Sequence, residues 1–286
     1  MRSLRPLLAA IPFVALAGCD YIDDPIQPGG VGGGGGSEVV TKKVLLEDIT
    51  GHRCNNCPAA AAIAQQLHGI YGEELIIVGV HATSTFAAPV SPPNPNGSYA
   101  TDFRTIAGDA YVGAFGVQVL PTGLVSRKAF NGSRTLAADA WGSAVADLIG
   151  QPADLDLWFS QFTHNPATNT ISAEVKVAVL NTVQGDHNLT IYLTEDSVID
   201  WQYDSQATPP DVPNYVHRHV LRNNLNGTWG APLITGSAQA GDTLTLSYSG
   251  FAIDPAWDPD HLALIGYAHT TSNDEVVQAA ERKLRP

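Results

Sequence analysis

Two cysteines separated by two residues are the part of this sequence best suited to chemistry. Cys54 and Cys57 enclose Asn55-Asn56, and Pro58 follows directly at the start of an alanine-rich stretch. A thiol at the first turn of a helix faces unpaired backbone N–H groups and the positive end of the helix dipole, and both favour the thiolate. We therefore expect Cys54 to be the exposed, attacking thiol and Cys57 to resolve the mixed disulfide from one turn inward.

A zinc site is the alternative use of the same pair. His52 and His81 could join Cys54 and Cys57 as four ligands. Such a site usually shows two well-spaced pairs of ligands, and the second pair is missing here. We therefore expect no metal and no cofactor.

The N-terminus indicates an exported protein. Arg2 and Arg5 precede an apolar run from Leu7 to Ala17, which ends at Leu16-Ala17-Gly18-Cys19. The run has about half of the ~20 apolar residues that a membrane-spanning helix needs, so it is typical of a signal peptide over residues 1–18. Its end resembles the bacterial lipobox, which implies that several acyl chains on Cys19 anchor the protein in a membrane.

Charge and cysteine count limit the partners. The chain has 15 Lys and Arg against 28 Asp and Glu, a net charge of −13, which argues against nucleic acid as a partner. With Cys19 lipidated, Cys54 and Cys57 are the only pair left, and the loop that they would close is too short to staple a fold. Besides the membrane, we expect the thiols or disulfides of exported proteins as partners.

The composition predicts a tether followed by two domains. Residues 19–37 contain an almost unbroken glycine tract, which is typical of a flexible linker. Residues 38–150 alternate apolar runs with helical stretches, with helices expected at 57–68, 99–111 and 136–149 and a strand at 75–80. Residues 151–286 show about seven strands with alternating polarity, as in an immunoglobulin-like sandwich.

A second motif gives the first domain a resemblance to a known fold. The segment from Phe115 to Thr122, with Leu120-Pro121-Thr122 at its end, resembles the cis-proline segment of thioredoxins. The expected fold class is therefore an α/β thioredoxin-like domain followed by an all-β immunoglobulin-like sandwich domain. The resemblance implies that Pro121 is cis and that Leu120 and Pro121 bind an extended substrate beside the cysteines. It also implies a buried proton shuttle at Glu47 or Asp48, and the strand register that decides between them is left open.

Two further segments are distinctive: the one from Leu45 through Pro58 and the strand around His217-Arg218-His219. Through them, nearly the whole mature chain resembles the twenty-eight-kilodalton outer-membrane protein family. Membership implies an outer-membrane lipoprotein that faces the periplasm or the cell surface. Two functions stay open: a thiol–disulfide oxidoreductase, which we favour, and an adhesin or scaffold whose disulfide only clips the start of the helix. His217-Arg218-His219 could bind a ligand, but we favour solvated or interface-facing side chains for this run.

Overall fold

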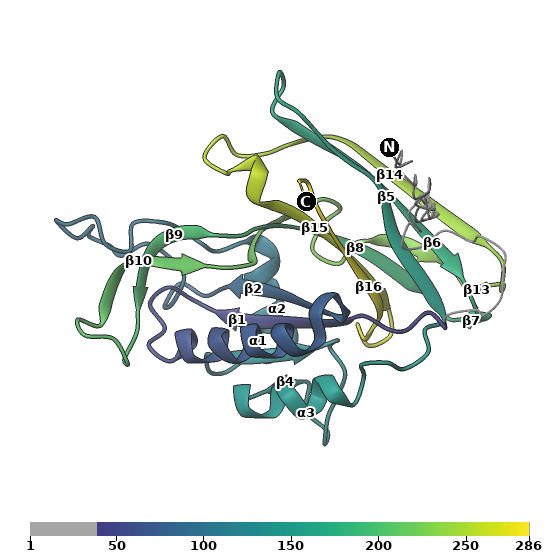
Figure 1. Ribbon diagram of the computed structural model, residues 1–286, viewed down its shortest axis with the longest axis horizontal. Helices are drawn as coiled ribbons and strands as arrows, with labels where there is room; N and C mark the ends of the chain where they lie inside the picture. The colour runs from purple at the N-terminus through teal and green to yellow at the C-terminus, as the bar shows by residue number, and fades with distance from the viewer. Residues whose placement is uncertain (1–38, 286) are drawn as a thin grey trace, which may run out of the picture. The chain divides into compact units, whose positions relative to one another are not determined.

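One mixed sheet runs through the part of the chain that the computed structural model describes, residues 39–285 (Figure 1). In spatial order its strands are β16 (Val276–Lys283), β15 (Leu262–Thr270), β8 (His187–Glu195), β11 (Val220–Asn224), β2 (Leu75–His81), β1 (Val44–Thr50), β3 (Thr122–Val125) and β4 (Thr135–Leu136); β12 (Ala231–Ile234) also pairs with β8. Strand β2 is parallel to both β1 and β11, whereas the other neighbours are antiparallel. Strands from both halves of the sequence therefore lie side by side.

Helices cover both faces of the sheet around β1. Helix α1 (Cys57–Tyr71) has a proline in its first turn and ends at Gly72, which has a φ of 56°. It packs with α3 (Trp141–Ala146) on the face that carries Val44 and Leu46. Helix α2 (Ile106–Ala114) packs on the opposite face, with Leu45 and Ile49. Because all seven residues of β1 are buried, both faces of this strand are core.

A second sheet packs against the late strands of the first. It contains β14 (Thr243–Ala252), β6 (Thr170–Val179) and β5 (Leu155–Asn165). Its inward residues form a core with those of β8 and β15, including Ile191 and Leu264. The remaining pairs are β9 (Val198–Tyr203) with β10 (Asp211–His217) and β7 (Val183–Gln184) with β13 (Ser237–Ala238). Single 3-10 turns occur at η1 (Gly72–Glu74), η2 (Ala138–Ala140) and η3 (Pro259–His261).

The predicted fold class, an α/β thioredoxin-like domain followed by a separate sandwich, is wrong. Strands take 43% of the described residues and helices 16%, so the chain is mostly β. Strand β11 inserts between β8 and β2, and the late strands thereby extend the sheet that β1 and β2 begin. The contacts accordingly make the described residues, 39–285, one compact unit without a division near Gly150. Alternating polarity predicts a strand, but it does not say which sheet the strand joins.

Local predictions near the cysteines fare better. The helix expected at 57–68 and the strand expected at 75–80 are confirmed as α1 and β2. The helix expected at 136–149 is shorter, because only residues 141–146 are α-helical. The predicted signal peptide, the lipidated Cys19 and the tether lie outside the described residues. Within 39–285, no helix is long and apolar enough to cross a membrane.

Candidate functional site

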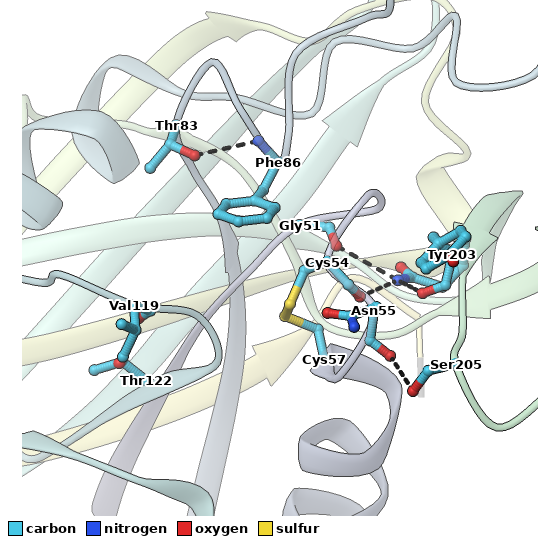
Figure 2. The surroundings of a disulfide bond; sticks show 11 residues. Gly51, Cys54, Asn55, Cys57, Thr83, Phe86, Val119, Thr122, Tyr203 and Ser205 are labelled. Atoms are coloured by element: carbon cyan, nitrogen blue, oxygen red, sulfur yellow. Dashed lines mark hydrogen bonds between the residues drawn. A yellow bond between two sulfur atoms is a disulfide. The ribbon is translucent and has the colours of Figure 1, made fainter.

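Cys54 and Cys57 form a disulfide at the start of α1 (Figure 2). The S–S distance is 2.07 Å and the two Cα atoms are 5.4 Å apart. Only 1% of the Cys54 surface and 2% of the Cys57 surface are exposed. The expectation that Cys54 lies at an exposed lip of the helix is therefore wrong.

Two segments far from the motif in sequence cover the disulfide. The backbone N–H of Arg53 donates to the carbonyl of Phe86 over 3.0 Å, and the ring of Phe86 lies beside the sulfur atoms (Figure 2). From the end of β9, the side chain of Gln202 donates to the carbonyl of Cys54 over 3.0 Å. The backbone N–H of Ser205 donates to Asn55 over 3.1 Å. These hydrogen bonds fix the motif beneath two segments that shield it from solvent. The sequence of the motif alone does not indicate this shielding.

The proline segment lies on a third side of the disulfide. The peptide bond between Leu120 and Pro121 is cis. The hydroxyl of Thr122 donates to the carbonyl of Val119 over 2.7 Å, and in Figure 2 both residues lie on the side of the disulfide opposite Tyr203. Val119 is 68% exposed, so this segment reaches the surface. That Leu120 and Pro121 bind an extended substrate remains a prediction.

The strand register separates the two candidate carboxylates. Asp48 shares its face of β1 with Leu46, and this face is covered by α1. Glu47 points to the opposite face, where it pairs with the buried Arg127. Asp48, not Glu47, is therefore the carboxyl on the side of Cys57.

Asp48 is buried, and one of its carboxyl oxygens has no hydrogen bond. Only 4% of the residue's surface is exposed, and the oxygen without a hydrogen bond is Oδ1. Burial raises the pKa of the Asp48 carboxyl to about 7, because desolvation disfavours the charged form. A carboxyl with this pKa can accept or return a proton near neutral pH.

A cavity of about 510 Å³ joins Asp48 to the disulfide. Its wall combines one side of α1, the ends of β1 and β2, and the segment from β9 to the residues after β10. The polar residues among those that line it are Asp48, Thr50, Gln65, His81, Gln202, Asp204, Gln206, Tyr215, His217, Arg218 and His219, and Cys57 lines it as well.

The histidines of the cavity are neutral at pH 7. Burial lowers the pKa of His217 to about 4 and that of His219 to about 4. Burial also lowers the pKa of His81, whose ring lies 5.3 Å from that of His217. Asp48 is thus a titratable carboxyl among uncharged imidazoles.

The sequence prediction for His217-Arg218-His219 is wrong only in part: His217 is not solvated, but both histidines face residues of the first half of the chain across the cavity, in agreement with the interface-facing alternative. His217 is 3% exposed, and both His217 and His219 line the cavity rather than solvent. Arg218 fits the prediction better, since half of its side chain is exposed and its guanidinium pairs with Asp196 at 3.3 Å. The sequence feature that could have indicated this wall of the cavity is the presence of two histidines between apolar residues.

The four residues of the zinc alternative do not come together. His52 turns away from the cysteines: its Nε2 lies 3.2 Å from the carbonyl oxygen of Ala88, and its ring meets that of Phe103 edge-on. Across residues 39–285, the structure has no group of three or more His, Cys, Asp or Glu side chains placed to hold a metal ion.

Comparison with known proteins defines the class. The family model described as outer membrane protein Omp28 matches residues 108–286, more than half of the sequence. The chain belongs to this family. The resemblance to the twenty-eight-kilodalton outer-membrane proteins is confirmed, and so is the predicted outer-membrane location.

Solved structures are similar to this chain to different degrees. HBP35 of Porphyromonas gingivalis is 19% identical with a TM-score of 0.62, and the match covers 86% of this chain and 77% of that one. A protein from Agrobacterium tumefaciens is 11% identical with a TM-score of 0.51, over 86% and 96% of the two chains. A domain of the outer membrane lipoprotein Omp28 from Porphyromonas gingivalis is 16% identical over 47% of this chain and 90% of that one, with a TM-score of 0.29. No curated protein matches the sequence.

Proposed function

We propose that this outer-membrane protein performs thiol–disulfide exchange through Cys54 and Cys57. One observation carries the proposal: Cys57 lines the same cavity as Asp48, a buried residue whose Oδ1 atom has no hydrogen bond. Burial of a carboxyl oxygen without a hydrogen bond costs stability, so its presence beside a cavity suggests a role other than stabilisation. A proton acceptor beside a sulfur that alternates between disulfide and thiol is such a role.

The exchange needs a thiolate at each step, and the site favours one. Helix α1 begins at Cys57, and its N-cap Asn56 makes no side-chain hydrogen bond to the first turn. The free N–H groups of that turn and the helix dipole stabilise a thiolate formed there. Asp48 would take up the proton that the incoming thiol loses and return it to the sulfur that leaves.

The reduction potential of the pair tests this function. The oxidised protein is equilibrated with glutathione buffers, and the free thiols are counted by alkylation and mass. We expect a potential above about −300 mV, the region of labile and catalytic disulfides. The variant with Cys54→Ser and Cys57→Ser is the blank for alkylation. A potential below that value, with no reduction at high glutathione, would contradict the proposal.

Burial of both sulfurs favours a second candidate, a scaffold protein with a structural disulfide. The covering segments hold the motif through the contacts of Phe86, Gln202 and Ser205. In that case the pair resists reduction, the protein has no exchange activity, and removal of the disulfide lowers only the stability of the fold. The potential therefore separates the two candidates.

For the outer-membrane location we propose the anchor that the sequence suggests, with residues 1–18 removed and Cys19 acylated. The acyl chains would provide the stable attachment. Replacement of Cys19→Ser should release the folded protein into the soluble fraction. Membrane association of a correctly processed Ser variant would show that another element holds the protein.

A further inference from the structure

We infer that the cavity beside α1 admits a low-molecular-weight thiol, which attacks the sulfur of Cys57 rather than that of Cys54. The inference rests on the proposed exchange function and specifies its substrate and the sulfur attacked. It reverses the order expected from the sequence, in which Cys54 attacks first.

Both cysteines are almost completely buried, with 2% of Cys57 exposed, and they differ in their position relative to the cavity. Cys57 is among the residues that line the cavity of about 510 Å³, and Cys54 is not. Cys54 is 1% exposed, the ring of Phe86 lies beside it, and its carbonyl is bound by Gln202. A reagent that enters through the cavity therefore meets Cys57 first.

The lining of the cavity selects a small partner. Alanines and Pro58 of α1 form one wall, and the segment that contains Tyr215 and His217 forms another. An extended polypeptide would have to displace the segment around Gln202 and Ser205, which is hydrogen-bonded to the motif itself. A thiol of a few heavy atoms fits the volume without that displacement.

Asp48 provides the second, independent feature of the site. Its carboxyl is almost completely buried, has an Oδ1 atom without a partner, and belongs to a residue of the cavity wall. A thiol that enters the cavity can donate its S–H to this carboxylate before it attacks. The same proton can then pass to the sulfur that leaves.

The reaction balances in two steps. In the first, R–SH gives its proton to Asp48, and its sulfur forms a bond to the Cys57 sulfur. The Cys54–Cys57 bond breaks at the same time, and its electron pair leaves with the Cys54 sulfur. Asp48 then passes the proton to Cys54. In the second, another R–SH attacks the R sulfur of the mixed disulfide. R–S–S–R leaves and Cys57 becomes a thiol, so two small thiols are oxidised and one protein disulfide is reduced.

Trapping the intermediate tests which sulfur is attacked. The oxidised full-length protein is mixed with cysteamine and quenched in acid with N-ethylmaleimide after increasing times. Peptide mass spectrometry then locates the two adducts. We expect cysteamine on Cys57 and maleimide on Cys54. The opposite distribution would overturn the inference and leave the exchange function intact, whereas a disulfide that cysteamine does not open would contradict the exchange function itself.

Single-cysteine variants give a second measurement. Cys54→Ser retains Cys57, and Cys57→Ser retains Cys54; each is treated with cystamine. We expect Cys57 to form its mixed disulfide at least about tenfold faster, because access controls the rate. Both variants should react at similar rates in urea. Equal rates in the folded variants would count against entry through the cavity.

A filled cavity should block the reaction. Ala61 is a half-buried residue of α1 that lines the cavity, so Ala61→Leu should slow cysteamine in opening the disulfide. Ala114→Leu, at an exposed position at the end of α2, is the matched control and should leave the rate unchanged. An equal rate in Ala61→Leu and the control would overturn the inference.

Discussion

Arg127 donates two hydrogen bonds of 2.8 Å to Glu47, from Nε to Oε2 and from Nη2 to Oε1, and neither side chain is exposed. The same Nη2 lies 2.8 Å from the hydroxyl of Tyr192 and 3.0 Å from that of Tyr267, so its two N–H bonds are shared among three acceptor oxygens. Glu47 lies on β1, whereas the two tyrosines lie on β8 and β15. One buried cluster therefore ties together the two halves of the chain that the sequence assigned to separate domains.

Removal of Arg127 should destabilise the protein strongly. Arg127→Met leaves the Glu47 carboxylate buried and unpaired, and loss of one partner of a buried ion pair costs about 3–5 kcal/mol. Urea unfolding at neutral pH measures the change. Arg104→Met, which breaks the partly exposed pair with Asp102, should cost less than about 1 kcal/mol. If the two variants lost similar amounts of unfolding free energy, the buried ion pair would contribute no more to stability than the partly exposed one.

This cluster shows where prediction from sequence ends. The strand at 75–80 and the helix after Cys57 follow from apolar runs, alanine content and Pro58, all of which act locally. The pairing of β11 with β2, through Val220 and Gly79, joins residues far apart in the chain. No pattern within either strand encodes that neighbour, so the one-sheet architecture could not be predicted.

Asp48 should make the protein less stable as the pH rises. Its pKa is about 7 in the folded protein and about 3.8 when solvated, so the folded state binds more protons between these values. The free energy of unfolding should fall from pH 4 to pH 7 and level off above, by an amount on the order of 4 kcal/mol. Asp48→Asn should remove this slope and be the more stable protein at pH 8. Urea midpoints across the pH range test it, with Asp139→Asn at an exposed position as the control.

The same residue should shape the rate of exchange. If Asp48 accepts the proton of the incoming thiol, the rate at which cysteamine opens the disulfide rises as the carboxyl ionises near pH 7. Asp48→Asn should lose this step and keep only the rise caused by ionisation of cysteamine itself. An unchanged pH–rate profile would remove Asp48 from the reaction.

His217 should have the opposite effect on stability in acid. Burial lowers its pKa to about 4, with smaller contributions from His52 and Arg222, against the raising effects of the Trp201 carbonyl and Asp200. The unfolded chain therefore binds more protons between about pH 6.5 and 4, and stability falls as the pH drops through this window. The loss attributable to His217 is on the order of 3 kcal/mol.

The matched variants for this effect are His217→Gln and His261→Gln. Glutamine can still donate to the Trp201 carbonyl but does not titrate, so His217→Gln should lose less stability between pH 6.5 and 4 than the unmodified protein. His261 is partly exposed, with 43% of its side chain accessible, and its replacement should leave the acid limb in place. Identical acid limbs in all three proteins would contradict the assignment.

Only part of the candidate site could be predicted from the sequence. The C-x-x-C motif identifies Cys54 and Cys57. Because side chains alternate along a strand, the consecutive residues Glu47 and Asp48 must face opposite sides of the sheet. Which side holds α1 is a property of the assembled sheet. The cover over the disulfide, from Phe86 and Gln202, comes from segments that carry no redox motif, which is why the exposure of Cys54 was predicted wrongly.

Gln202 should control how readily the disulfide opens. Its side-chain N–H group donates to the carbonyl of Cys54 over 3.0 Å and to that of Tyr203 over 2.8 Å, and the residue is 3% exposed. Gln202→Ala removes the donor and leaves the Cys54 carbonyl without it, at a net cost of about 1 kcal/mol. Because the motif is then held less firmly in its covered state, cysteamine should open the disulfide faster, by up to about tenfold, and urea unfolding should show the matching loss of stability. Gln184→Ala, at an exposed position on β7, is the control and should change neither quantity. A Gln202→Ala protein that loses stability but opens its disulfide at the original rate would show that the cover from β9 does not limit access to the sulfur atoms.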